Sequence, residues 1–259
     1  LDAESYGGNK TIILEPSGTA PSQIGSARVW IAEGVAIENV SAGAGDDSIV
    51  GSSGNNYVSS GSGNDTVSAG SGADIIYGHE GSDNLSGDNG NDWMNGNQDS
   101  DTMTGGSGDD TVMGGKAADI ISGGSGNDWM NGNLGSDIVN GNDGNDLLRG
   151  GKENDTVRGG EGQDSLYGDL GDDSLDGDGG SDAFYFSANS GNDSIDGFDN
   201  PGATAGDIIY ISSSYYSTAA EVFANSAIAA ADTIITLDGS NSIRVLGAST
   251  LSVDDFAIF

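Results

Sequence analysis

The sequence predicts an all-β protein: a right-handed parallel β-roll, a β-solenoid with 18 residues per coil turn, that ends in a β-rich C-terminal cap. Three observations predict this fold. They are a nine-residue repeat, 46 glycines among 259 residues, and 41 acidic against 7 basic residues, which gives a formal net charge of −34. Glycine richness and high charge alone are equally typical of a disordered chain, because like charges oppose compaction. The regularity of the repeat favours the roll.

The repeat has the pattern G-G-x-G-x-D-x-U-x, in which U is a large apolar residue, and it runs without insertion from Ala42 to Tyr185. This span contains 16 repeats. The sixth position is aspartate in 15 of them and asparagine, Asn56, in the other, whereas the eighth position is apolar in all 16. We therefore expect residues 42–185 to form the roll.

Each repeat predicts a very short strand, x-U-x, with the U side chain pointing inward, followed by a six-residue loop. Glycine at the first, second and fourth positions permits loop backbone angles that other residues avoid. Two repeats make one coil turn, and coil turns stack about 4.8 Å apart, so the loops of repeats n and n+2 lie above one another.

The flanks differ from the repeats in composition. Residues 1–41 are expected to form strands that lead into the roll. Residues 186–259 are expected to cover its last coil turn, which a solenoid would otherwise expose. Within this cap, residues 207–211, 233–237 and 242–246 predict strands and residues 218–231 predict a short helix.

The stacked loops predict a metal site built from oxygen atoms, because each pair offers two carboxylates and several main-chain carbonyls. Such a ligand set suits calcium. Pairing each of the 16 repeats with the one two further along leaves up to 14 sites, whose divalent ions would carry +28 against the formal −34. The candidate carboxylate ligands are Asp47, Asp65, Asp74, Asp83, Asp92, Asp101, Asp110, Asp119, Asp128, Asp137, Asp146, Asp155, Asp164, Asp173 and Asp182. The candidate carbonyl ligands belong to Gly43, Gly45, Gly61, Gly63, Gly70, Gly72, Gly106, Gly108, Gly124, Gly126, Gly160 and Gly162.

The pattern also predicts which sites are irregular. The site that joins Asn56 to Asp74 lacks one formal charge and is expected to bind calcium more weakly. Asp99, Ala117 and Glu153 replace glycine at the fourth position, all on one row of loops, and are expected to distort or empty sites there. Because the core of such a coil is thin, we expect metal binding to supply the free energy of folding.

Several classes of function are excluded by composition. The acidic balance argues against nucleic acid and anionic membranes as partners, since both need basic patches. No apolar run is long enough to span a membrane, and without cysteine there is no disulfide or thiolate metal site. His79, the single histidine, is expected to be a solvent-exposed loop residue, so no catalytic residue is expected. The first residues contain neither an initiator methionine nor a signal peptide, which is expected of a processed or excised piece of a longer protein.

The repeats resemble the RTX (repeats-in-toxin) nonapeptides. The flanks are similar to the C-terminal domain of serralysin-type secreted metalloproteases, in segments 1–6, 31–39, 43–47, 182–186, 191–193, 199 and 206–209. This resemblance implies calcium between the loops, a secreted or cell-surface location, and export by a type I secretion system. In that family the exporter recognises an acidic residue followed by apolar ones at the extreme C-terminus, as in segment 254–259 here. The zinc-protease motif H-E-x-x-H is absent, so a protease domain of the parent would lie before Leu1.

Three functions therefore stay open: a folding and export module of a secreted protein, a surface-layer or matrix protein that assembles through calcium, and a non-catalytic module of a polysaccharide-modifying enzyme. Nearly identical segments at 90–97 and 126–133 are expected to place Trp93 and Trp129 outward on one face, about 10 Å apart, from two strand spacings. The two tryptophans are either tolerated surface residues of a duplicated segment or an aromatic pair that contacts a cell-surface polymer or a protein.

Overall fold

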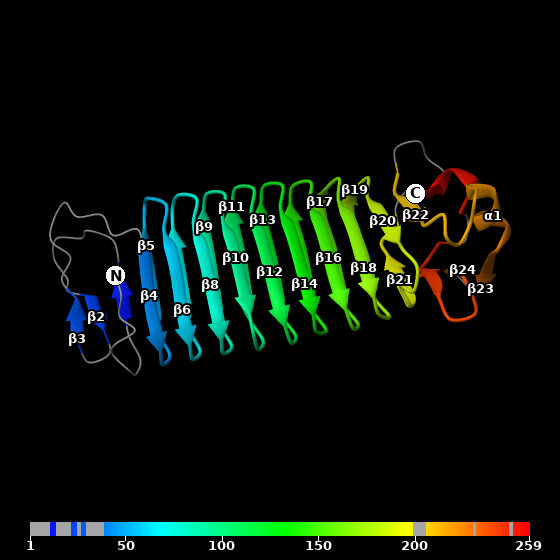
Figure 1. Ribbon diagram of the computed structural model, residues 1–259. Helices are drawn as coiled ribbons and strands as arrows, with labels where there is room; N and C mark the ends of the chain where they lie inside the picture. Colours follow the sequence, from blue (N-terminus) through cyan, green and yellow to red (C-terminus); the bar gives the residue numbers. More distant parts are fainter. Residues whose placement is uncertain are drawn as a thin grey trace. The chain divides into compact units, whose positions relative to one another are not determined.

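The computed structural model describes residues 39–198, 206–229, 232–248 and 251–259, together with the backbone of three short strands before them. The chain divides into two compact units, Leu1–Gly126 and Asn127–Phe259. Figure 1 labels the strands of both. Most of residues 1–41, the predicted lead-in strands, lie outside the described residues. What is described there is β1 (Thr11–Ile13), which pairs with the first coil turn, and an antiparallel pair, β2 (Ser22–Ile24) and β3 (Ala27–Val29).

The first unit contains two parallel sheets whose strands alternate along the chain. One sheet contains β1, β5 (Ser48–Ser52), β7 (Thr66–Gly70), β9 (Asn84–Asn89), β11 (Thr102–Ser107) and β13 (Ile120–Ser125). The other contains β4 (Asn39–Ala44), β6 (Tyr57–Ser62), β8 (Ile75–Glu80), β10 (Trp93–Asn97) and β12 (Thr111–Lys116). Paired residues are 18 apart, as in Trp93 with Thr111, which is the predicted length of one coil turn.

The second unit continues the same alternation and adds the cap. One parallel sheet contains β15 (Ile138–Asp143), β17 (Thr156–Gly162), β19 (Ser174–Gly180), β21 (Asn192–Asp196) and β25 (Ser242–Val245). Antiparallel strands β24 (Asp232–Thr236) and β23 (Ser226–Ala229) extend it. The other parallel sheet contains β14 (Trp129–Leu134), β16 (Leu147–Lys152), β18 (Ser165–Leu170), β20 (Ala183–Phe186), β22 (Ile208–Ile211) and β26 (Phe256–Ile258).

The core of each unit is the column of eighth-position side chains. All 16 of them, from Ile49 to Phe184, expose 2 % or less of their surface. This confirms that the apolar position points inward. The fold is therefore an all-β parallel β-solenoid, as the repeat predicts.

The strands are longer than the predicted x-U-x. β9, for example, runs through six residues, from the seventh position of one repeat to the third of the next. The second position stays in register across the coil turn, since Asp88 pairs with Gly106. The six-residue loop was a wrong expectation, because the parallel backbone pairing continues through the first three positions and leaves a loop of only three residues.

The cap contains the predicted strands at 207–211, 233–237 and 242–246 as β22, β24 and β25. The predicted helix is shorter than expected. It is α1 (Ala219–Ala224), capped by the Thr218 side chain, and the chain then turns into β23. A short 3₁₀ turn, η1 (Val253–Asp255), precedes the last strand. No helix within the described parts of the chain is both long and apolar enough to cross a membrane.

Candidate metal centre

The sixth-position aspartates form buried ladders along the loops. Every predicted aspartate ligand, from Asp47 to Asp182, exposes 3 % or less of its surface. The backbone N–H of one aspartate donates to Oδ1 of the aspartate one coil turn later, at 2.8 Å from Asp83 to Asp101 in the first unit and at 2.8 Å from Asp146 to Asp164 in the second. The ladder therefore fixes each carboxylate and leaves its other oxygen for a different partner.

That other oxygen, Oδ2, is buried, and many of these atoms have no hydrogen-bond partner among the described residues. They belong to Asp65, Asp74, Asp83, Asp92, Asp101, Asp146, Asp155, Asp164, Asp173 and Asp193. A buried carboxylate oxygen without a partner is strongly unfavourable, so native proteins pair such groups or let them coordinate metals. The Oδ2 atoms are thus suited to a cation.

Electrostatics lead to the same requirement. Burial raises the pKa of Asp83 and Asp101 to about 7 and that of Asp155 to about 8, and neighbouring carboxylates raise these pKa values further, against the backbone hydrogen bond that lowers them. Without a cation, the folded chain holds protons that the unfolded chain has already lost, so the fold loses stability as pH rises from about 4 through these values. A bound divalent cation would remove this penalty.

First-position glycines occur where there is little room for a side chain. None of them in the described structure has a φ in the left-handed region, so the expectation that they supply unusual backbone angles is wrong. A Cβ at Gly96 would overlap Asp101 Oδ2 and lie 2.8 Å from the carbonyl oxygen of Gly114. Glycine here leaves room for the buried carboxylate.

Second- and fourth-position glycines other than Gly54 do have left-handed φ values. All 12 predicted carbonyl ligands are among them, with φ from 93° at Gly43 to 150° at Gly162. Their carbonyls point at the next coil turn, since a Cβ at Gly61 would overlap the oxygen of Gly43 and a Cβ at Gly63 that of Gly45. The loops therefore hold columns of main-chain oxygens on the side where side chains are excluded.

The three fourth-position replacements keep a positive φ, but not the φ values of the left-handed glycines at this position, which run from 109° at Gly45 to 156° at Gly171. Asp99, Ala117 and Glu153 have φ values of 66°, 70° and 72°. Asp99 Oδ2 accepts from Gly81 N at 3.1 Å, and Glu153 Oε2 accepts from Gly135 N at 3.0 Å, each one coil turn back. The backbone of these loops therefore differs from that of the glycine loops, as the expected distortion requires, and each such φ costs a side chain about 1 kcal/mol or more.

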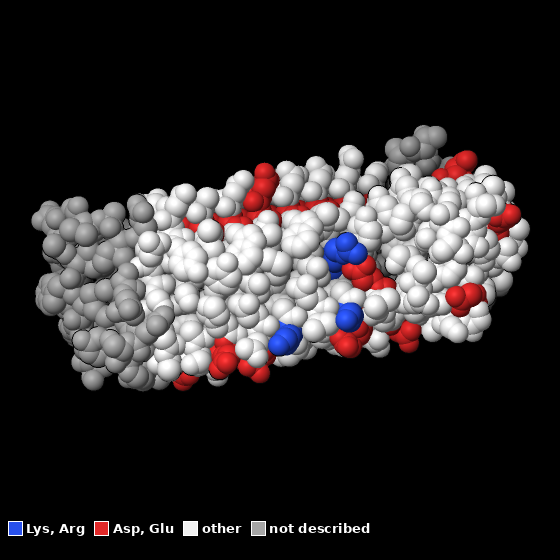
Figure 2. Space-filling model, in the orientation of Figure 1, with Lys and Arg blue, Asp and Glu red and all other residues white. Residues whose placement is uncertain are grey.

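The donor set fits calcium better than a metal bound by side chains alone. Within the described residues, no three acidic or histidine side chains converge on one point. A cation at these loops would need main-chain carbonyls as well as Oδ2 atoms, and calcium accepts such mixed shells of six to eight oxygens. Figure 2 shows that Asp and Glu atoms emerge mainly along the loop edges, whereas the sheet surface between them carries little charge.

Two more aspartates continue the ladders beyond the uninterrupted repeats. Asp173 N donates to Asp193 Oδ1 at 3.0 Å, and Asp182 N donates to Asp207 Oδ1 at 2.9 Å. Their spacings are 20 and 25 residues, so the strict nine-residue pattern missed them. The signals that remained in the sequence are Gly191-Asn192-Asp193 and the apolar run after Asp207.

The fifth position forms a second ladder that sequence reasoning also missed. Asn64 Oδ1 accepts from Ser82 N at 3.0 Å, and Asn145 Oδ1 accepts from Gln163 N at 2.7 Å, one coil turn further on. The frequent Asn and Asp residues at this position were the available signal. Side chains on this second ladder lie exposed and contribute to stacking, not to the buried rows.

Asn56 differs from the aspartates of its row. Its Oδ1 accepts from Ser52 N at 2.7 Å and its Nδ2 donates to Ser52 Oγ at 3.1 Å, so the side chain is held by its own loop. We expect Asn56→Asp to lower the calcium concentration that half-saturates this end of the roll by about threefold, because a formal charge is restored. Isothermal titration calorimetry with calcium, on the variant and on the wild type, checks this. An unchanged midpoint would contradict the prediction of a weak site at Asn56.

Two other predicted surface features can be placed. His79 is exposed, as expected, but it lies in β8, where Nε2 is 2.9 Å from Ser59 Oγ and the ring stacks on Tyr77. Trp93 and Trp129 are half-buried at the starts of β10 and β14, in different units, so their separation stays a prediction.

The repeats match a known family profile. The family profile of the RTX calcium-binding nonapeptide repeat matches residues 36–67, 59–94, 68–103, 104–139, 113–148, 140–175 and 149–184, which together cover more than half of the chain. No curated protein matches. Among solved structures, the extracellular lipase LipA from Serratia marcescens matches with 18 % identity and a TM-score of 0.36. That match covers 83 % of this chain and 40 % of the lipase. On the strength of the profile match, the chain belongs to the family of RTX calcium-binding nonapeptide repeat proteins.

Proposed function

We propose that this chain is a calcium-folded domain of a secreted protein, which stays unfolded in a calcium-poor cytosol and folds outside the cell. The observation that carries the proposal is the row of buried aspartate Oδ2 atoms without partners, such as those of Asp83 and Asp101. Extracellular calcium modules bind at roughly 10⁻⁴ to 10⁻³ M, so folding would follow arrival in calcium-rich surroundings.

The energetics of such a switch come from charge. The chain carries a formal −34, and its core is one apolar side chain deep on each side of the coil. Self-repulsion and buried carboxylates oppose folding, whereas calcium would neutralise both at once and add its binding free energy to folding.

The C-terminus supports a role in type I export. Phe256, Ala257 and Ile258 pair with β22, and Asp255 and Phe256 are buried. An exporter could therefore reach the whole of this acidic-then-apolar tail only before the cap folds. A chain that stays unfolded without calcium would keep the tail accessible until export is complete.

We infer that the chain itself is non-catalytic and that its parent is a serralysin-like protein with its enzyme domain elsewhere. The supporting observations are the repeat family and the resemblance of the flanks. The surface-layer alternative is supported by a different observation: Tyr57, Ile75 and Phe259 are exposed apolar side chains, at 43 %, 41 % and 50 %. Growth in particle size with added calcium, measured by light scattering, would favour assembly over a monomeric export module.

Circular dichroism during a calcium titration tests the proposed function. We expect the chain in excess chelator to show an unordered spectrum, and a strand spectrum to appear cooperatively at millimolar calcium or below. Magnesium at the same concentration is the control, because it demands a smaller octahedral shell and should not fold the chain. Full strand signal in chelator would refute the proposal.

A further inference from the structure

Residues 188–195 form a further repeat that lies beyond the last residue matched by the family profile, 184. Asn189 and Gly191 have the left-handed φ values of the second and fourth positions, 66° and 106°. Asp193 is buried at the sixth position, and Ile195 is buried at the eighth. The preceding repeat is two residues longer than the others, and one of these residues, Phe186, extends β20 and is itself buried.

This loop stacks on the preceding one as the regular loops do. Asp193 Oδ1 accepts from Asp173 N at 3.0 Å, and Asn192 N donates to Asp172 Oδ1 at 2.8 Å, so both ladders continue across the change of spacing. Gly171 N donates to the carbonyl oxygen of Ser190 at 3.0 Å. The stacking geometry therefore survives although the nine-residue register does not.

Two buried carboxylate oxygens here, Oδ2 of Asp173 and Oδ2 of Asp193, have no hydrogen-bond partner within the described part of the chain. The buried hydroxyl of Ser190 lies next to the Asp193 carboxyl, with which it can share a cation. Each of the three residues exposes only 2 % of its surface. A buried hydroxyl together with two buried carboxylates is an oxygen set for a hard cation.

We propose that Asp173, Asp193 and Ser190 form a calcium site outside the nonapeptide register, and that this site couples calcium binding to the docking of the C-terminal hairpin. The proposal rests on the calcium-dependent folding proposed above and adds to it. It assigns a ligand role to Ser190 and Asp193, and it makes the cap respond to calcium through its own site.

The hairpin β24–β25 attaches to this loop. Gly191 N donates to Asn241 Oδ1 at 2.9 Å, Ser242 N donates to the Gly191 carbonyl at 3.0 Å, and Ser242 Oγ lies 2.9 Å from Asn192 Oδ1. β25 then pairs along β21, with Ser194 opposite Arg244. If calcium orders residues 190–195, it also forms the edge of β21 on which the hairpin docks.

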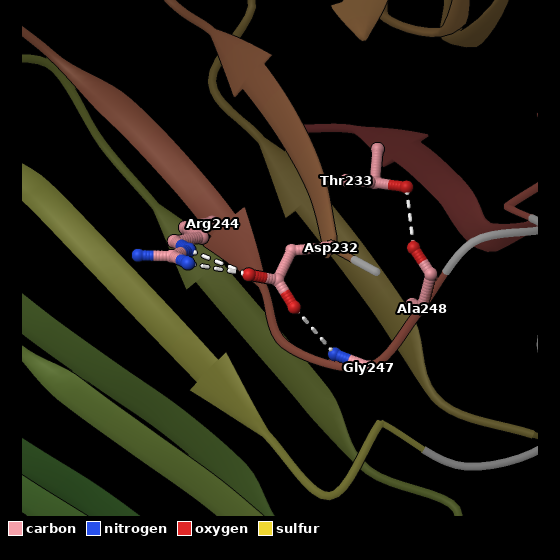
Figure 3. A network of polar contacts seen from close by, with 5 residues as sticks. All are labelled: Asp232, Thr233, Arg244, Gly247 and Ala248. Atoms are coloured by element: carbon pink, nitrogen blue, oxygen red, sulfur yellow. Dashed lines mark hydrogen bonds and ion pairs between the residues drawn. The ribbon is translucent and has the colours of Figure 1, made fainter. Parts of the chain in front are cut away.

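The hairpin also has its own internal brace (Figure 3). Arg244 Nε donates to Asp232 Oδ2 at 2.9 Å, Gly247 N donates to Asp232 Oδ1 at 2.9 Å, and Thr233 Oγ1 donates to the Ala248 carbonyl at 2.6 Å. None of these contacts involves the proposed site. The hairpin is therefore expected to leave the roll as one piece when the site is empty, and not to unravel strand by strand.

Asp193→Asn in the full chain tests the site, because asparagine keeps the Oδ1 acceptor for Asp173 N and removes only the charge at Oδ2. We measure hydrogen exchange of peptides over 84–107 and 242–248 during a calcium titration, with tryptic cleavage after Arg244 as a second readout. The variant is expected to raise the half-protecting calcium concentration of 242–248 by about tenfold, and Ser190→Ala by about threefold, because the charge and number of ligands set affinity. The midpoint of 84–107 should stay within about twofold of the wild type.

The matched controls are Asp196→Asn and Ser187→Ala, which change exposed residues close to the loop. Both should leave the midpoint of 242–248 unchanged. An unchanged midpoint in Asp193→Asn would overturn the site, and so would a loss of protection of 242–248 in this variant that saturating calcium does not restore. Protection of 84–107 in chelator would instead overturn the calcium-dependent folding on which the site rests.

Discussion

Replacing Gly96 with valine is expected to prevent folding of the coil turns around it, even at saturating calcium. The added Cβ would overlap Asp101 Oδ2 and lie 2.8 Å from the Gly114 carbonyl, and neither the fixed carboxylate nor the backbone can retreat. Overpacking of this kind costs about 3 kcal/mol or more, a large fraction of the stability of a thin core. The chain itself places nothing larger than serine at this position.

Gly54→Val is the matched control in the same unit. A Cβ at Gly54 has Ser52 Oγ, at 3.9 Å, as its nearest neighbour, and the residue has no left-handed φ. We expect this variant to fold at the calcium concentration of the wild type, by circular dichroism and thermal unfolding. Wild-type unfolding of Gly96→Val would contradict the assignment of the space beside its Cα to a carboxylate.

Neutralising two neighbours of one row, Asp146→Asn with Asp164→Asn, is expected to raise the calcium requirement for folding of the second unit by well over tenfold. Asparagine preserves the Oδ1 acceptor of the ladder, on which Asp146 N donates to residue 164 at 2.8 Å. What it removes is the charge on two buried Oδ2 atoms. Hydrogen exchange of peptides over 138–170 across a calcium titration measures the shift.

The response of the double variant to saturating calcium distinguishes a calcium ligand from a merely structural group. Burial of the charged form raises the pKa of Asp146 to about 7 and that of Asp164 to about 6, so neutral asparagines should make the calcium-free fold no less stable than the wild type. Asp143→Asn, at an exposed position, should change neither measurement. If the double variant stays unprotected even at saturating calcium, the aspartates act through hydrogen bonds and not through a cation.

Much of this fold follows from the repeat. An inward apolar residue every nine positions fixes the coil, and a sixth-position aspartate that recurs without a gap fixes the buried rows. The predicted strands were too short because the glycine content of G-G-x is typical of a loop. In the stack, Gly87 and Asp88 continue β9, which pairs with the neighbouring coil turn. Pairing between coil turns is a property of the stack, and a single repeat does not contain it.

The repeat also does not show why a given position must be glycine. Gly96 is required by the side chain of Asp101, five residues later, and this contact depends on how the loop folds back. Asp193 and Asp207 escaped the pattern because longer connections interrupt its spacing, although the stack preserves their places. The loss of register marks where the coil meets its cap, so the same insertions that hid these residues indicate a change of role.

The number of calcium ions bound per folded chain tests whether calcium folds the roll. Native mass spectrometry counts these ions on samples whose repeat amides are checked by hydrogen exchange. Pairing the 16 repeats predicts up to 14 ions, and the loop at Asp193 adds one more. We expect a count of about this size, acquired together with amide protection between residues 42 and 195. A chain whose repeats are protected while it carries only one or two ions would contradict this expectation. Protected repeats in a chain that carries no ion, in chelator, would contradict it as well.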